Sequence, residues 1–426
     1  MAACAGRTGI DRARLVAAGA AWLVTLALAF GEVAANPLEG EQPARKDEAR
    51  EGIDLEATLT GVAQGTHASA AAEGERETRG TYRGDVAVTL PGGSAGEARG
   101  KIFAHVRFGR GSGVALRPTY TGTPNSTAFQ TPGTNDRYGI LAQAWYQLTF
   151  PAGASDAQAR PQVDITAGKI DPFVFFDQNA VADDETRRFL NNAFVHNPLL
   201  DSGGDVGADR HGFAPGARVA YTSMQDDSGF ALSLGVFGSG PDTDLTGSLR
   251  DAFLVAQAET AGRAVAGQRG TLRVYAWRNG RAADFAEAWQ RHAGWGISAE
   301  QQIGKAIMLF TRLGAETQGQ VRFDRALTLG AEIAATPFGR GSDALGVAVG
   351  FLRTSPDYRA ATADATLAGY AASGTERVAE IFYRIRVGEH LEITPDLQWI
   401  ARPGGDAAAP TIVIGGLRAR IGNLER

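Results

Sequence analysis

Residues 380–400, EIFYRIRVGEHLEITPDLQWI, contain two runs in which apolar and polar side chains alternate, separated by a turn at 387–390. Successive side chains of a β-strand point to opposite faces, so each run predicts a strand with one apolar and one charged face. Such a strand fits a wall between lipid and water. The apolar set is Ile381, Tyr383, Ile385, Val387, Leu391, Ile393, Leu397 and Trp399, and the opposite set is Glu380, Phe382, Arg384, Arg386, Glu392, Thr394, Asp396 and Gln398.

The same alternation recurs from about residue 56 onward, in runs of roughly ten residues bounded by Gly, Pro, Asn, Asp or Ser. The pattern predicts an all-β fold, an antiparallel transmembrane β-barrel of about 16 strands. A soluble β-sandwich or solenoid is the alternative, although no repeat of solenoid length is present. The predicted strands are 56–67, 79–90, 100–109, 138–150, 161–170, 214–223, 229–238, 250–260, 269–278, 294–303, 305–316, 326–336, 344–353, 376–388, 389–400 and 410–421.

The N-terminal region predicts export. Three arginines precede an apolar run from Leu15 to Phe30, and Val33-Ala34-Ala35 offers a cleavage site, so residues 1–35 are predicted to be a signal peptide. A single membrane-anchoring helix is the alternative, but the run is shorter than a spanning helix needs. Residues 36–55 are polar and predict a flexible leader, which leaves residues 56–426 for an outer-membrane barrel.

Composition excludes several function classes. The formal net charge of −5 argues against nucleic acid as a partner. The single cysteine, Cys4, lies in the predicted signal peptide, so the mature chain has no disulfide framework. No motif for a nucleophile and its base is present, and the six histidines lack metal-ligand spacing, so we expect no catalytic residues, no metal and no cofactor. Residues 201–209 only faintly resemble a calcium loop.

The longest stretch between predicted strands begins with GKIDPFVFFDQNAVADDETRRFLNNAFVHNP, residues 168–198. Asp183 or Asp184 can cap a short helix that continues through Arg187 and Arg188. A long loop inside a compact domain is usually functional, so we expect this one to fold into the barrel and narrow it. A lid outside the barrel mouth is the alternative.

Alternation and loop position together select the residues expected to line the channel. On the strands these are Arg107, Arg273, Arg312, Glu316, Glu380, Arg384, Arg386, Glu392 and Asp396. In the loop they are Asp171, Asp177, Asp183, Asp184, Glu185, Arg187 and Arg188. Lys169 is ambiguous, because it shares its parity with Val163 and Ile165. The tryptophans are expected at the membrane interface rather than in the lumen; these are Trp145, Trp277, Trp289, Trp295 and Trp399.

Several motifs resemble the carbohydrate-selective porins of the OprB family. The segment GKIDPFVFFDQN…FVHNP is similar to the family's G-K-x-D-x-x-x-F-F-D start and F-x-N-x-P end, and AYTSMQDDSGFALSLGVF and ITPDLQWI…PGG are similar to later family elements. The resemblance implies a monomeric sixteen-stranded outer-membrane barrel, surrounded by lipid and inserted by the barrel-assembly machinery. It also implies a charged and aromatic constriction that favours small carbohydrates such as glucose.

Other functions stay open beside a sugar-selective porin. The barrel could serve as a general porin for small solutes, or it could export a polymer. An outer-membrane enzyme is disfavoured, because the sequence lacks a catalytic triad and metal-ligand spacing. Which sugar passes, and whether the barrel is a monomer or a trimer, do not follow from the sequence.

Overall fold

The computed structural model describes residues 52–67, 77–111, 113–121, 137–152, 160–201, 211–225, 228–240, 249–335 and 339–423. The predicted signal peptide and all but the last four residues of the predicted leader lie outside the described residues. The calcium-like stretch 201–209 also lies outside them, except for its first residue.

Sixteen strands are present in the described part of the chain, and each overlaps one predicted run. They are β1 (Asp54–Thr66), β2 (Glu77–Ala95), β3 (Ala98–Gly111), β4 (Arg137–Pro151), β5 (Gln162–Ile170), β6 (Ala214–Gln225), β7 (Ser228–Phe237), β8 (Phe253–Arg263), β9 (Arg269–Ala283), β10 (Trp289–Ile303), β11 (Ile307–Gln318), β12 (Phe323–Ala334), β13 (Ala344–Thr354), β14 (Thr375–Val387), β15 (Leu391–Ala401) and β16 (Ile412–Gly422).

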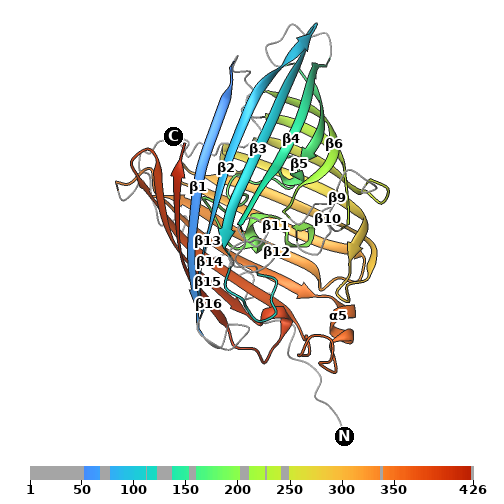
Figure 1. Ribbon diagram of the computed structural model, residues 1–426, viewed down its shortest axis with the longest axis vertical. Coiled ribbons are helices and arrows are strands. Elements are labelled where there is room, and N and C mark those ends of the chain that lie inside the picture. Colours follow the sequence, from blue (N-terminus) through green and yellow to red (C-terminus); the bar gives the residue numbers. More distant parts are fainter. Residues whose placement is uncertain are drawn as a thin grey trace.

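The strands form one closed antiparallel barrel in which each strand pairs with its neighbours in sequence (Figure 1). The ring closes between β1 and β16, with Thr58 opposite Gly422 and Thr66 opposite Ile414. Closure leaves no strand edge without hydrogen bonds, which a sheet in lipid requires. The predicted transmembrane barrel architecture is therefore confirmed.

The two faces of the wall follow the predicted alternation. On β3, Ile102, Val106 and Phe108 are exposed on the outside, whereas His105 and Arg107 point inward and are largely buried. A barrel surface that meets lipid carries such exposed apolar side chains in place of a hydrophilic coat. Glycine and alanine at many inward positions leave space for the segment that enters the barrel.

The two ends of the barrel differ. Residues 304–306 and 388–390 form short turns at one end, whereas residues 112–136 and 171–213 form long connections at the other. The long-loop end also carries α5 (Pro356–Ala361) and the 3-10 turn η4 (Pro403–Gly405), while η2 (Val265–Gly267) lies in a turn at the opposite end. Among the described residues, no helix is long and apolar enough to cross a membrane.

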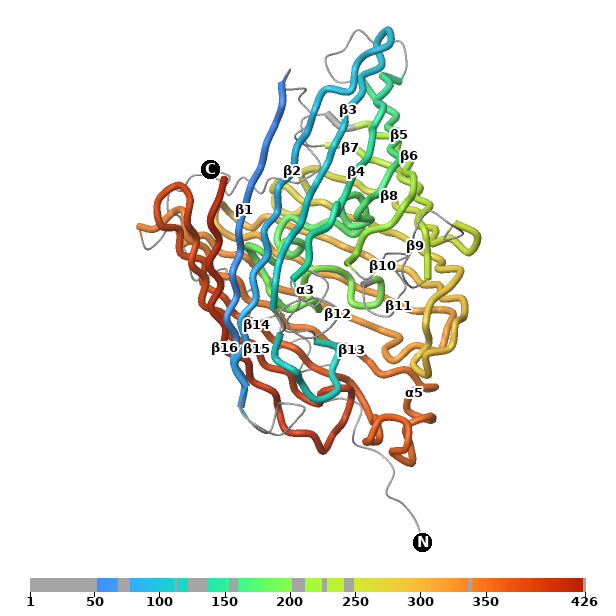
Figure 2. The backbone as a smooth tube through the Cα atoms, viewed as in Figure 1, coloured from blue at the N-terminus to red at the C-terminus, as the bar shows by residue number. Residues whose placement is uncertain are grey.

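The segment from Asp171 to Asp201, here called the inner loop, lies inside the ring of strands (Figure 2). It contains the 3-10 turn η1 (Pro172–Val174) and the short helices α3 (Asn192–Val195) and α4 (Pro198–Asp201). The Phe189 ring packs against Phe194, Phe310 and Phe382, with ring centroids 5.0 to 5.5 Å apart. Burying one such ring contributes about 1.5–3 kcal/mol, so the inner loop has an apolar core in common with the wall of β11 and β14.

Candidate functional site

Asp177 is the main polar anchor of the inner loop. Its fully buried carboxylate accepts hydrogen bonds from the Tyr275 hydroxyl at 2.6 Å, from Arg312 Nε at 3.0 Å and from the Asn197 N–H at 2.6 Å. Arg312 also donates to the Asp177 carbonyl at 2.9 Å and to the Phe194 carbonyl at 2.8 Å. A buried ion pair whose remaining donors are all satisfied favours a single geometry. Asp177 thus joins two parts of the loop to β9 and β11.

Asn197 fits into a notch made by two glycines of the wall. A Cβ atom at Gly296 would lie 2.5 Å from Asn197 Nδ2, and one at Gly314 would lie 2.3 Å from Asn197 Oδ1. The amide donates to the Tyr275 hydroxyl at 2.8 Å and to the Leu313 carbonyl at 3.1 Å. The glycines of β10 and β11 are therefore needed for the loop to approach the wall this closely.

Glu380 and Arg418 hold the middle of the inner loop from the other side of the barrel. The Glu380 carboxylate accepts from the Leu190 N–H at 2.6 Å and from the Asn191 N–H at 2.9 Å. Arg418 donates to the carbonyls of three loop residues at 2.6 to 2.9 Å; these are Glu185, Arg187 and Arg188. The two side chains replace the hydrogen bonds that a helix would have supplied to this stretch.

These contacts correct the helix predicted after Asp183 or Asp184. Asp184 caps one turn only, by accepting from the Thr186 N–H at 2.9 Å and from its hydroxyl at 2.6 Å. The chain then extends, because Glu380 binds the two N–H groups that follow Phe189. The helices of the loop instead begin after Asn191, which caps α3, and after Asn197.

The two adjacent carboxyls of the loop ionise differently. Burial raises the pKa of Asp183 to about 6, although Arg188, 3.2 Å away, favours its charged form. Burial also opposes ionisation of Asp184, but the nearby Arg420, the Thr186 hydroxyl and Arg188 outweigh it and lower its pKa to about 2. Asp183 is therefore the member of this pair whose charge changes near neutral pH.

A polar cluster surrounds Glu392 where the inner loop faces β14, β15 and β16. Arg187 Nε, Arg420 Nη1 and Arg384 Nε lie 3.4, 3.7 and 3.9 Å from its carboxylate oxygens. Within the described part of the chain, neither Glu392 oxygen accepts a hydrogen bond. Three arginine nitrogens likewise donate none to a described residue; these are Arg384 Nε, Arg420 Nε and Arg420 Nη1. We call these four residues the Glu392 cluster. Glu392 is only 2% exposed, so its carboxylate is enclosed among these three guanidinium groups.

A second charged group links the loop to β2 and β3. Arg83 contacts the loop's Glu185 at 2.5 Å and Asp85 at 2.6 Å. Asp85 also contacts His105 at 2.8 Å and Arg107 at 2.9 Å. The inner loop is thus attached on two sides, and charged groups of both signs lie beside it.

Aromatic rings and cations alternate on the inward face of β3 to β6. The Phe103 and Trp145 rings stack with centroids 4.8 Å apart, and the Phe175 ring meets Trp145 edge-on at 5.8 Å. The Lys101 ammonium lies 5.5 Å from the Trp145 ring, and the Arg218 guanidinium lies 4.5 Å from the Phe175 ring. Cations at this distance from a ring face are attracted to it, so this wall presents fixed aromatic faces with positive charge beside them.

The expectation for the tryptophans is partly wrong. Trp145 and Trp277 are buried on the inward face, where they contact Phe103 and Tyr275. A bulge in the pairing of β3 with β4 between His105 and Val106 shifts the parity of β4 ahead of Trp145. The other three tryptophans are exposed on the outside, as a membrane-interface position requires; these are Trp289, Trp295 and Trp399.

The structure places the predicted strand residues on the inward face, but it divides them into two groups. Arg312 and Glu380 bind the inner loop, as does Asp177 within it, so these three anchor the loop, whereas Arg273 is buried in the wall between Glu259 and Glu300. Arg107, Arg384 and Glu392 belong to the charged groups beside the loop, together with the loop residues Asp183, Asp184, Glu185, Arg187 and Arg188.

The remaining predicted residues occupy other positions on the loop and the wall. Asp171 caps η1 by accepting from the Phe173 N–H at 3.0 Å, and Arg386 lies at the short-turn end of β14, where its N–H donates to Asp343. Glu316 and Asp396 are buried inward residues of β11 and β15. The Lys169 ammonium lies 5.8 Å from the ring of Phe213, beside Arg107, so it points inward despite its parity.

Sequence reasoning did not select six titratable residues that the structure brings to the site. These are Arg83, Asp85, His105, Glu332, Arg418 and Arg420. The signal that could have found them is the alternation already used, because Arg83 shares the parity of Asp85, and Arg418 and Arg420 alternate with apolar residues in GLRARIG. Glu332 forms two contacts with Arg384, at 3.2 and 3.3 Å.

Part of the chain is similar in sequence to known porins. Residues 253–422 match the family model described as carbohydrate-selective porin, OprB family. A curated relative, porin AaxA of Chlamydia pneumoniae, is 29% identical over 128 residues, which cover 30% of this chain and 28% of that protein. The chain thus spans less than a third of that relative's length.

Among solved structures, OprB of Pseudomonas putida at high pH superposes with a TM-score of 0.71 at 18% identity, covering 87% of this chain and 94% of that one. The outer-membrane channel DcaP of Acinetobacter baumannii gives a TM-score of 0.52 at 12% identity, covering 87% and 96% of the two chains. At these identities the structural matches establish the barrel fold, and the family match extends over β8 to β16.

Proposed function

We propose that this chain, which matches the OprB family model over residues 253–422, belongs to that family of carbohydrate-selective porins and is an outer-membrane channel for passive diffusion of small, glucose-like carbohydrates. The family and the fold are those of channels rather than enzymes, and they indicate the outer membrane of a Gram-negative bacterium. A monomer, surrounded by outer-membrane lipid and inserted by the barrel-assembly machinery, is part of the proposal. So is export through the predicted signal peptide.

The Glu392 cluster is the observation that carries the proposal. Three guanidinium groups converge on one carboxylate at 3.4 to 3.9 Å, which is long for direct hydrogen bonds. Because Glu392 is only 2% exposed, binding of a sugar hydroxyl here requires one arginine side chain to move aside. A sugar hydroxyl can donate to Glu392 and accept from an arginine at the same time. Because both signs of charge are present, the cluster suits a neutral polyhydroxyl solute.

The aromatic wall supports the same solute class. The stacked Phe103 and Trp145 rings offer an apolar face to the C–H side of a sugar ring, while the charged groups offer partners to its hydroxyls. A channel also needs weak binding, because the solute must leave. Mixed apolar and polar contacts spread along the wall meet this need better than one tight pocket.

The test is single-channel conductance of the refolded protein in a planar bilayer, with glucose, maltose and gluconate titrated in. We expect glucose to reduce the ion current in a saturable way. Glu392→Gln should weaken this block about tenfold, since a hydrogen bond to a charged group contributes about 1.5–3 kcal/mol. Glu287→Gln, in an exposed connection between β9 and β10, should leave the block unchanged.

Other outcomes separate the alternatives. Ion steps that no sugar affects would replace the sugar-selective channel with a general porin for small solutes. Stronger block by gluconate than by glucose would contradict a preference for neutral sugars. The absence of ion steps from protein shown to be folded would overturn the porin function and favour a polymer-export barrel.

A further inference from the structure

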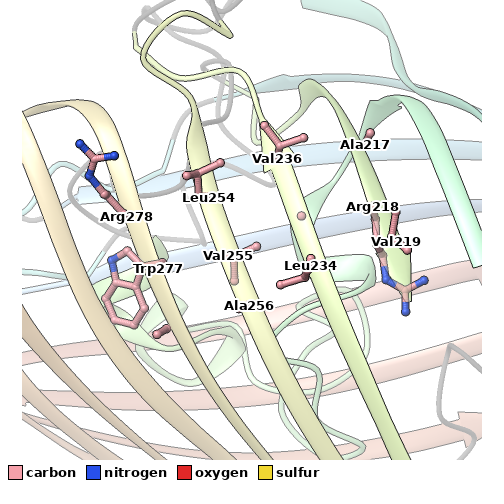
Figure 3. A pocket seen from close by; sticks show the side chains of 12 residues that line it. Ala217, Arg218, Val219, Leu234, Val236, Leu254, Val255, Ala256, Trp277 and Arg278 are labelled. Carbon is pink, nitrogen blue, oxygen red and sulfur yellow. The ribbon is translucent and has the colours of Figure 1, made fainter. Parts of the chain in front are cut away.

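The outward face of β6 to β9 carries an apolar depression that the channel function does not use (Figure 3). Two rows of outward side chains cross it in register. One row runs through Ala217, Val236, Leu254 and Arg278, and the next runs through Val219, Leu234, Ala256 and Ala276. The rows lie two residues apart along each strand, or about 7 Å.

Small residues make the floor of the depression and larger ones make its sides. Ala256 and Ala276 face each other across the β8–β9 pair, whereas Leu234 is 64% exposed and stands above them. Trp295, the register partner of Ala276 on β10, is 42% exposed on the neighbouring strand. The depression is therefore an open apolar groove on the lipid-facing surface, a few side chains wide.

Four arginines lie at one end of the depression, where the exposed carboxylates of Asp251 and Glu287 also lie. Arg278 lies in the row nearer the long loops, and Figure 3 shows its guanidinium beyond Leu254 at that end. Arg281 and Arg291 are exposed at the same end, and the Arg281 guanidinium covers the Trp289 ring at 5.1 Å. Arg250 is exposed in the segment that pairs with this end of β9 through the Gly280 N–H.

We propose that this depression binds one molecule of outer-leaflet lipopolysaccharide, with an acyl chain over the alanine floor and a lipid A phosphate on Arg278. The long-loop end of an outer-membrane barrel lies on the extracellular side of the membrane. The arginines therefore lie at the headgroup level of the outer leaflet, which consists of this lipid. Arginine binds phosphate through two parallel hydrogen bonds. Exposed tryptophans such as Trp289 and Trp295 are common where a barrel meets the membrane–water interface.

Charge complementarity favours this occupant over a second copy of the chain. A twofold contact through the depression would bring the same patch together on both subunits and place the arginine groups of both copies near one another. Like charges at such a contact oppose association. A bis-phosphorylated lipid, in contrast, neutralises them while its acyl chain covers the leucines.

The test measures binding of purified hexa-acyl, bis-phosphorylated lipid A to the full-length barrel in detergent by native mass spectrometry. We expect one retained lipid A per barrel. Arg278→Glu should reduce the bound fraction at least tenfold, and Ala276→Phe, which fills the floor, should reduce it similarly. The matched control is Arg377→Glu, an exposed outward arginine at the long-loop end of β14, which should have no effect.

Two further measurements keep the proposal falsifiable. Heat-modifiable migration in gel electrophoresis establishes that each variant is folded, and sugar block of its conductance reports the lumen separately. Equal loss in Arg278→Glu and Arg377→Glu, or equal retention of phosphatidylglycerol and lipid A, would overturn the site. Conversion of a dimer to a monomer by Ala276→Phe would assign the depression to contact between copies instead.

Discussion

Replacing Asp177 with alanine should release the inner loop while leaving the barrel closed. Asp177 and Arg312 are both fully buried, and the carboxylate accepts three hydrogen bonds from two strands and from the loop itself. Removing one partner of such a pair leaves a charge buried without compensation, which costs about 3–5 kcal/mol. The barrel wall does not depend on this pair, because its strands are joined by a complete ring of backbone hydrogen bonds.

The expected change in loop occupancy follows from that free-energy cost. At about 1.4 kcal/mol per factor of ten, a loss of about 4 kcal/mol shifts the equilibrium between the bound and the released loop by roughly a thousandfold. A loop that is released for a measurable fraction of time should give larger and noisier single-channel currents. It should also be cleaved by added protease in a barrel that still migrates as folded protein.

Asp324→Ala is the matched control. Asp324 forms an ion pair with Arg353 at 2.5 Å, but the arginine side chain is 47% exposed, and exposed pairs contribute about 0–1 kcal/mol. This variant should therefore conduct and resist protease like the parent protein. A folded Asp177→Ala barrel with parental current noise and an uncleaved loop would refute the assignment of Asp177 as the loop's anchor.

Two further predictions concern the inner loop. Because the pKa of Asp183 is raised to about 6, its carboxyl loses its proton between pH 5 and 7, and the cation-to-anion permeability ratio measured from reversal potentials should rise over this range. The folded pKa lies above the usual 3.8, so the stability that the neutral carboxyl contributes is lost as pH rises through about 6. Asp183→Asn should reduce both effects, and Asp171, whose pKa burial also raises to about 6, accounts for part of the remainder. Gly314→Ala should displace the loop and cost about 1–3 kcal/mol, as overpacking does, which thermal unfolding and conductance can measure. Gly415→Ala, where a Cβ meets no atom within 4 Å, should be neutral, and equal effects of the two substitutions would contradict the notch.

The wall of the barrel could be predicted from the sequence because its signal is local. Alternation has a period of two residues, so the two faces of each ten-residue run can be assigned from that run alone, independently of its neighbouring strands. All sixteen predicted runs overlap an observed strand, and residues such as Arg384 and Glu392 lie on the predicted face. One exception, Trp145, follows the bulge in β4, whereas Trp277 lies in a regularly paired stretch and shares the inward parity of Arg273 and Tyr275.

The use of each inward residue was decided by the tertiary structure. Asp177 and Arg312 are separated by 135 positions in the chain, and nothing in their local sequence distinguishes an anchor covered by the loop from a residue beside open space. The same holds for Glu380, which lies on the predicted face but binds the backbone of the inner loop.

The physical reason is that alternation constrains one strand at a time, whereas the role of an inward residue depends on where the loop that follows β5 contacts β9 to β16. The position of the loop is set by the glycine notch at Gly296 and Gly314, by the Asp177 anchor and by Glu380. These residues come together only in the closed ring of strands. The sequence by itself therefore determined the barrel and the facing of most of its wall, and the folded chain alone decided which inward charges bind the inner loop.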